Sequence, residues 1–192
     1  MQNQSWMATV VFAVIAFGGG YFAGVHGPAS GLGSQEASNI LPNDTQCYFS
    51  PGGGCTDAIV AQIDAARHSI EFQGYTFTSR PIGTALVAAH RRGVDVKVIL
   101  DAASTGDHRT EAVYIARAGI PVYLDAKHAI AHNKVILIDD QTLVTGSFNF
   151  TRAAEDENAE NVLILHNQPQ IQSAYEENFR KHLGHSELFD GK

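Results

Sequence analysis

Residues 132–149 place an imidazole, an ammonium group and small polar side chains at spacings that could serve one reaction. His132 and Lys134 stand two positions apart at the start of an apolar run, and Ser147 and Asn149 follow the next apolar run. On a β-strand, side chains two positions apart point to the same face, so His132 and Lys134 are expected to project together. An imidazole nucleophile beside a cation and polar donors suits attack on a phosphodiester, because charge develops on the non-bridging oxygens during the reaction.

Each of these side chains has an expected role in such a site. His132 is the candidate nucleophile and Lys134 the candidate fixed cation. Ser147 and Asn149 are the candidate donors to phosphate oxygens. Asp139 falls on the opposite strand face when positions are counted by two from His132, so we expect it to be structural at the turn.

The spacing of this stretch resembles the signature of the phospholipase D superfamily, which is His-x-Lys, four residues, Asp, six residues, then Gly-Ser-x-Asn. Every specified position of the signature is matched, at His132, Lys134, Asp139, Gly146, Ser147 and Asn149. Residues 69–101 and 150–165 are similar to small bacterial members of nuclease type that carry a single motif. The likeness covers about residues 47–185.

The resemblance implies a metal-independent phosphodiesterase without a cofactor. In this family the motif histidine attacks phosphorus to give a covalent phosphohistidine, a second histidine protonates the leaving oxygen, and water completes the hydrolysis. The chain carries one motif, so the resemblance implies a homodimer in which both copies supply His132 and Lys134. Glu160 matches the family position whose carboxylate hydrogen-bonds the nucleophilic imidazole, as an orienting acid does in a catalytic triad.

Three functions stay open from the sequence. The leading one is a nonspecific endonuclease for DNA or RNA, because no segment resembles a base-reading element and cutting would rest on backbone contacts. A phospholipase D or cardiolipin-type lipid hydrolase would use the same site, and a catalytically inactive, membrane-anchored binding module would not need the complete motif. The net charge of -7 argues against a broad basic surface for nucleic acid, although it permits a local positive pocket.

The N-terminal region differs from the rest of the chain. Residues 5–25 contain no charged side chain and would form a helix of roughly 30 Å, which is about the thickness of a hydrocarbon core. We expect residues 1–25 to be an uncleaved membrane anchor or a secretory signal peptide, and therefore the folded domain to lie outside the cytoplasm, in the periplasm or at a membrane. Residues 26–46 are rich in Gly, Ser, Pro and Asn and are interpreted as a flexible linker.

The two cysteines, Cys47 and Cys55, lie close together behind this export-like segment. The sequence therefore predicts a disulfide between them, with two independent free thiols as the alternative. Their spacing fits no common zinc site. His128 precedes His132 by four residues, but no Asp, Glu or Cys cluster in the sequence completes a metal site, so none is expected. The remaining histidines, His182 and His185 among them, are interpreted as scattered and mostly at the surface.

From residue 56 onward, helical and strand patterns alternate along the chain. Hydrophobic periodicity and capping residues predict helices over residues 56–68, 81–92, 109–118 and 168–182, and a short helix from about residue 151. Runs of β-branched and aromatic residues predict strands over residues 69–77, 94–100, 120–125, 134–139, 142–146 and 161–166. This alternation predicts an α/β fold for residues 47–192, with a mixed, mainly parallel sheet sandwiched by helices and a hydrophobic helix ahead of it.

Overall fold

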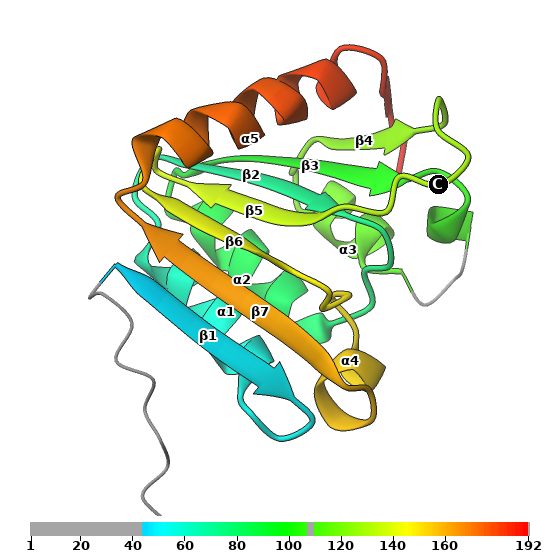
Figure 1. Ribbon diagram of the computed structural model, residues 1–192. Helices are drawn as coiled ribbons and strands as arrows, with labels where there is room; N and C mark the ends of the chain where they lie inside the picture. Colours follow the sequence, from blue (N-terminus) through cyan, green and yellow to red (C-terminus); the bar gives the residue numbers. More distant parts are fainter. Residues whose placement is uncertain (1–43, 107–109, 192) are drawn as a thin grey trace, which may run out of the picture. The chain divides into compact units, whose positions relative to one another are not determined.

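An eight-stranded β-sheet runs through the computed structural model, which describes residues 44–106 and 110–191 (Figure 1). Its strand order is β1-β7-β6-β5-β2-β3-β4-β8. The strands are β1 (Thr45–Ser50), β2 (Ser69–Gly74), β3 (Asp95–Asp101), β4 (Val122–Asp125), β5 (Lys134–Ile138), β6 (Thr142–Gly146), β7 (Glu160–His166) and β8 (Glu187–Leu188). The helices are α1 (Cys55–Ala65), α2 (Arg80–Arg91), α3 (Ala112–Arg117), α4 (Arg152–Asp156) and α5 (Pro169–Leu183), with a 3-10 turn at Ser104–Gly106.

The pairing of the strands confirms the mixed α/β class but not a mainly parallel sheet. Only β2 with β3 and β3 with β4 pair in parallel, whereas the other neighbouring strands are antiparallel. The prediction was wrong on this point because alternation of helices and strands does not fix the direction of pairing. β1 with β7 and β2 with β5 are antiparallel neighbours although they are distant in the sequence. Asp139 and Asp140 have φ values of 53° and 54°, and they form the tight turn that makes β5 and β6 an antiparallel hairpin.

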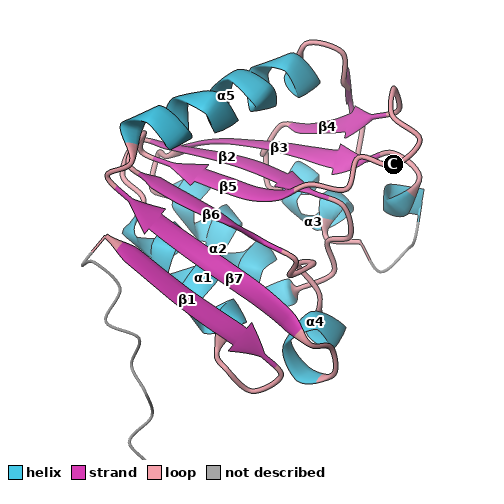
Figure 2. Ribbon diagram, in the orientation of Figure 1, coloured by secondary structure: helices cyan, strands magenta, loops and turns pink. Residues whose placement is uncertain are grey.

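Helices cover both faces of the sheet, as predicted (Figure 2). Along β5, Val135 and Leu137 pack with Phe179 of α5 on one face. Ile136 and Ile138 point to the other face and join the core formed with α1, α2 and α3. Because side chains alternate along a strand, this parity assigns every residue of β5 to one of two layers.

The described chain begins with a strand that the sequence pattern did not reveal. Thr45 and Gln46 are already in β1, paired with Leu165 and Ile164 of β7, so the predicted linker over residues 26–46 ends earlier than expected. The predicted anchor or signal over residues 1–25 lies outside the described residues. Within the ranges that are described, none of the helices has the length and apolar character needed to cross a membrane.

The predicted disulfide between Cys47 and Cys55 is wrong, since both thiols are free. Cys47 is exposed on β1, whereas its neighbour Tyr48 packs against the core that contains Cys55. Successive residues of a strand point to opposite faces, so the two thiols lie on opposite sides of the sheet. Burial, assisted by the nearby Glu155 carboxylate, raises the pKa of the Cys55 thiol to about 11.

Candidate active site

The predicted site residues, except Asp139, gather at the edge of the sheet where the parallel strands end. Gly74, the last residue of β2, pairs with Lys134, the first residue of β5. Asp101 and Asp125 pair with each other at the ends of β3 and β4. Ligands of open α/β sheets bind outside the carboxyl ends of parallel strands, so this edge is the expected place for a site.

His132 and Lys134 share an aromatic neighbour, Tyr75, which directly follows β2. The ring centroids of Tyr75 and His132 lie 4.6 Å apart, and the Lys134 ammonium lies 5.3 Å from the centroid of the Tyr75 ring. Lys134 is only 6% exposed, and its Nζ donates a hydrogen bond of 2.9 Å to the carbonyl oxygen of His132. Burial lowers the pKa of Lys134, and the Glu160 carboxylate partly opposes this effect. The site therefore holds a partly desolvated cation beside an exposed imidazole, which suits an anionic ligand.

The backbone immediately before His132 is anchored by Asp101. The amide of Ala131 donates to Oδ2 of Asp101 at 2.8 Å, and the amide of Ser104 donates to Oδ1 at 2.8 Å. Asp101 is 1% exposed, so these hydrogen bonds form out of water. The sequence interpretation missed both Asp101 and Tyr75. Asp101 directly follows a predicted strand, where ligand-binding residues often occur, whereas Tyr75 fell inside the predicted strand over residues 69–77 and follows β2 only in the structure.

Gly146 allows two strands to approach unusually closely. A Cβ atom at this position would lie 2.2 Å from the carbonyl oxygen of Asn161. That oxygen accepts hydrogen bonds from the amides of Ser147 and Phe148, at 3.2 and 3.3 Å. The Ser147 hydroxyl donates to Oε2 of Glu160 at 2.6 Å and accepts from the amide of Asn161 at 3.1 Å. Ser147 thus orders the turn within one chain, and its role as a phosphate donor stays a prediction.

Within the described part of the chain, Asn149 has an unpaired oxygen in its side-chain amide. Its backbone carbonyl accepts a hydrogen bond of 2.7 Å from the amide of Thr151. Its side-chain Oδ1 is buried and has no hydrogen-bond partner among the described residues. Because a buried polar atom without a partner costs free energy, this oxygen is an acceptor that a donor group of a ligand could satisfy.

Glu160 does not contact His132 within the described part of one chain. Its carboxylate accepts hydrogen bonds from Ser147 and from Nδ2 of Asn158, the latter at 3.1 Å, and its amide donates to the Ser50 hydroxyl at 3.2 Å. The carboxylate is still near enough to act electrostatically on the Lys134 ammonium. A contact between this carboxylate and the His132 imidazole therefore requires a rearrangement or a second chain.

Asp139 makes structural contacts at the start of the β5–β6 turn. Its two carboxylate oxygens accept hydrogen bonds from the amides of Arg67, His68 and Ser69, at 2.7, 2.7 and 2.9 Å. Burial alone would raise the pKa of Asp139, but these three hydrogen bonds outweigh it and lower the pKa. Asp139 thus fixes the segment that enters β2.

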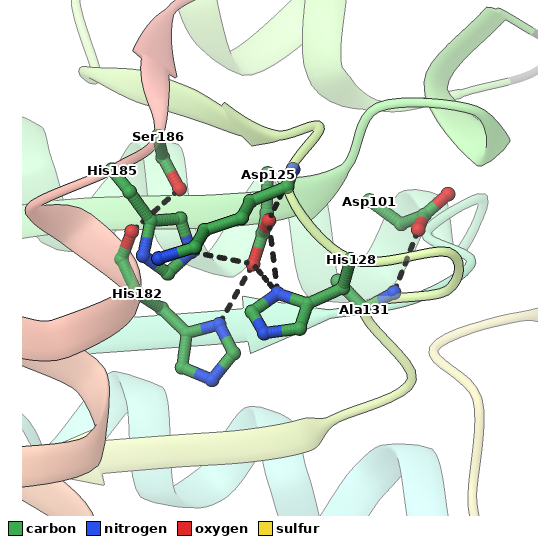
Figure 3. A network of polar contacts seen from close by, with 8 residues as sticks. Asp101, Asp125, His128, Ala131, His182, His185 and Ser186 are labelled. Atoms are coloured by element: carbon green, nitrogen blue, oxygen red, sulfur yellow. Dashed lines mark hydrogen bonds and ion pairs between the residues drawn. The ribbon is translucent and has the colours of Figure 1, made fainter.

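A second cluster of titratable side chains lies at the same edge, and the sequence interpretation missed it. His128, His182 and His185 are not scattered, because their rings converge on the buried carboxylate of Asp125 (Figure 3). The two segments that supply the cluster are more than 50 residues apart in the sequence. Asp125 and His128 are three residues apart, as are His182 and His185, and this equal spacing is the sequence feature that could have indicated the cluster.

The fold and the site define a phospholipase D-like α/β domain with one His-x-Lys motif. Residues 59–183 match the family model described as "Cardiolipin synthase, PLD-like domain". The chain therefore belongs to the phospholipase D superfamily, which confirms the prediction made from the motif.

Named relatives agree with this assignment. The chain is 44% identical to a phospholipase D of Rickettsia felis over 128 residues, which are 67% of this chain and 64% of that protein. It is 32% identical to the mitochondrial cardiolipin hydrolase of Canis lupus familiaris over 142 residues, covering 74% of this chain and 56% of that protein. This chain thus spans less than two thirds of the length of both relatives.

A solved structure matches the domain along nearly its whole length. It is that of Nuc, a phospholipase D family member from Salmonella typhimurium. The TM-score is 0.74 at 37% sequence identity, with coverage of 76% of this chain and 97% of that chain.

Proposed function

We propose that this protein is a metal-independent phosphodiesterase that hydrolyses nucleic acid as a nonspecific endonuclease. The observation that carries the proposal is the placement of the His132 imidazole and the buried Lys134 ammonium around Tyr75. Membership of the phospholipase D superfamily supports phosphodiester chemistry. The similarity to single-motif members of nuclease type favours nucleic acid as the substrate.

The proposed reaction has two steps through His132. In the first, an imidazole nitrogen forms a bond to phosphorus, the bond to the leaving oxygen breaks, and a second imidazole gives that oxygen a proton. In the second, the second imidazole takes a proton from water, whose oxygen attacks phosphorus and breaks the phosphorus–nitrogen bond. Lys134 stabilises the negative charge on the non-bridging oxygens in both steps. Asn149 is proposed to donate to the same oxygens through Nδ2 of its side-chain amide.

The second imidazole comes from a second copy of the chain. The motif occurs once in the sequence, so one chain supplies one His132 beside one Lys134. Glu160 makes no hydrogen bond to His132 within the described residues of a single chain, so we infer that this contact forms between the two copies. Sedimentation should therefore show a dimer at the protein concentrations at which hydrolysis occurs, and active monomers would contradict this step.

A lipid phosphodiesterase is the second candidate function. Relatives named phospholipase D and mitochondrial cardiolipin hydrolase favour it, because a lipid headgroup offers the same phosphodiester to the same residues. An inactive binding module anchored at a membrane is the third. The retained pair of His132 and Lys134 stands against it, since burying an ammonium without a catalytic need costs free energy.

The proposed location is outside the cytoplasm. Residues 5–25 form an uncharged apolar segment ahead of the domain, which is typical of an anchor or an export signal. Expression of the full chain followed by cell fractionation and protease accessibility of intact cells tests this directly. A domain that stays protected together with cytoplasmic markers would contradict it.

One panel of substrates tests the function. The purified chain is incubated in EDTA with plasmid DNA, with RNA and with cardiolipin vesicles. We expect nicking of plasmid DNA, and loss of that activity in His132→Asn while the exposed-histidine control His68→Asn keeps it. Hydrolysis of cardiolipin alone would select the lipid function, and no His132-dependent hydrolysis of any substrate would favour the binding module.

A further inference from the structure

Four side chains from two distant segments meet beyond the end of β4 (Figure 3). Asp125 is the last residue of β4, and His128 lies in the loop that follows it. His182 lies in the last turn of α5, and His185 lies between α5 and β8. One ligand atom from each of the four lies within 4.8 Å of the others.

The three rings all approach one oxygen of the Asp125 carboxylate. Nδ1 of His182 lies 2.7 Å from Oδ2, Nδ1 of His128 lies 3.0 Å from it, and Nε2 of His185 lies 3.2 Å from it. The carboxylate has no exposed surface, whereas the His128 ring is 44% exposed and the other two are 13% and 21% exposed. The carboxylate is therefore sealed, but the group can be reached from solvent through His128.

Hydrogen bonds alone do not satisfy this arrangement well. A carboxylate oxygen has two lone pairs, yet three imidazole nitrogens point at Oδ2. The other oxygen, Oδ1, is already bonded by the amide of Lys127 at 3.0 Å. The centroids of the rings are 4.9 to 5.3 Å apart, so protonating more than one of them would bring like charges together. A single divalent ion at the centre would replace these competing protons.

We propose that Asp125, His128, His182 and His185 form a binding site for a zinc ion. Imidazole nitrogens and a carboxylate oxygen are zinc ligands, and four protein ligands in tetrahedral arrangement are typical of a closed, structural zinc site. The two pairs, each with its members three residues apart, supply the four ligands from a loop and from the C-terminal segment. Small movements of the rings away from Asp125 would open the centre to the ion, because coordination replaces their present hydrogen bonds.

The ion is structural and stays apart from the phosphodiester chemistry. Tyr123, two residues before Asp125 on β4, packs with Phe179 of α5, so Asp125 belongs to the α5 face of the sheet. Lys134 has the parity of Ile136, which faces α1 and α2 on the other side. The zinc would instead tie the C-terminal segment to the loop that leads to His132.

Metal titration of the full chain tests the proposal. Protein stripped of metal is titrated with Zn²⁺ by calorimetry and with Co²⁺ by visible absorption, which reports tetrahedral coordination. We expect about one ion per chain, a higher melting temperature with Zn²⁺, and no stoichiometric binding in His182→Asn or His185→Asn. The matched control His68→Asn, which changes an exposed histidine outside the cluster, should bind as the unchanged chain does.

Two results would overturn the site. One is a folded, metal-stripped chain that binds neither ion, and the other is equal binding by the cluster variants. If His182→Asn fails to fold, His128→Asn provides the same test at the most exposed ring. The zinc site and the proposed hydrolysis can fail separately, because His132→Asn should keep zinc binding while it loses hydrolysis.

Discussion

The His132 site and the Asp125 cluster occupy one edge of the sheet but differ in how far their polar groups are already paired. At the His132 site the imidazole is exposed and the Oδ1 of Asn149 has no partner among the described residues. In the Asp125 cluster every ring already contacts the buried carboxylate. A site that binds and releases a substrate has polar groups without a hydrogen-bond partner, whereas a site for a permanently bound ion has its ligands already close together.

The two regions also differ in how the sequence encodes them. Apart from Glu160, the catalytic candidates fall within 18 consecutive residues and carry a recognisable spacing. The cluster depends on α5 returning over the sheet, so that His182 meets Asp125 from a distance of 57 positions along the chain. A motif of neighbouring residues can be recognised in the sequence, but the approach of side chains from distant segments appears only in the folded structure.

The largest expected effect comes from removing the cation of the His132 site. Lys134→Met keeps the length of the side chain but removes the charge that stabilises the phosphate oxygens. We expect kcat/KM for plasmid or model phosphodiesters to fall about 10²- to 10³-fold. The free energy of unfolding should stay equal or rise, because a buried ammonium no longer has to be desolvated. Lys97→Met, at a half-exposed position on β3, is the control, and equal losses in both variants would refute the role of Lys134.

The next effect tests the backbone that supports the same site. Gly146→Ala would force a Cβ to within 2.2 Å of the carbonyl oxygen of Asn161. We expect the free energy of unfolding, measured by urea denaturation, to fall by about 2–3 kcal/mol. Gly106→Ala is the matched control, because nothing lies within 4 Å of a Cβ placed there. A Gly146→Ala protein as stable as the control would contradict this expectation, because it would show that β6 and β7 can move apart at little cost in free energy.

Asp139 should contribute to stability in a pH-dependent way. Its pKa is lowered in the folded state, so its contribution is present above the unfolded-state pKa of about 3.9 and is lost as the pH falls through the lower folded-state pKa. We expect Asp139→Asn to lower the free energy of unfolding at neutral pH by about 2 kcal/mol. The free energy of unfolding of this variant should then fall less steeply as the pH is lowered. Denaturation across this pH range, with the exposed Asp64→Asn as control, makes the measurement. A decline as steep as that of the unchanged chain would contradict the assignment.

The smallest effect concerns Tyr75, the neighbour that the motif does not include. Tyr75→Leu removes the ring that packs on His132 and lies near the Lys134 ammonium. We expect kcat/KM to fall about 3- to 10-fold, which corresponds to about 1 kcal/mol. Tyr75→Phe keeps the ring and should restore most of the rate. Equal rates for Tyr75→Leu and the unchanged chain would remove Tyr75 from the site.

Much of the fold could be predicted because its elements have strong local patterns. The periodic apolar residues of α1, α2 and α5 and the β-branched runs of β2, β3 and β5 indicate a helix or a strand without knowledge of the neighbouring elements. β1 could not be predicted in this way, because Thr45–Ser50 becomes a strand only by pairing with β7. The cysteine spacing gave a wrong disulfide, since proximity in sequence does not reveal that Cys47 and Cys55 face opposite sides of the sheet.

The candidate site was predicted in part for a similar reason. The motif contains His132 and Lys134, and the Lys134 ammonium donates to the backbone carbonyl of His132 only two residues away. Tyr75 and Asp101 reach the site from the ends of β2 and β3, and their positions depend on strand register. The sequence shows which side chains could take part in phosphodiester chemistry. The arrangement of the sheet determines which of them lie close together.

The most direct test of the account is a search for phosphate on residue 132 during turnover. The chain is mixed with a phosphodiester carrying a labelled phosphate, quenched in alkali where phosphohistidine survives, and analysed by peptide mass spectrometry. We expect an acid-labile phosphoryl group on His132 that still carries the remaining ester of the substrate, and none in the His132→Asn protein. Rapid hydrolysis with no phosphate on His132 at any time of quenching would contradict it.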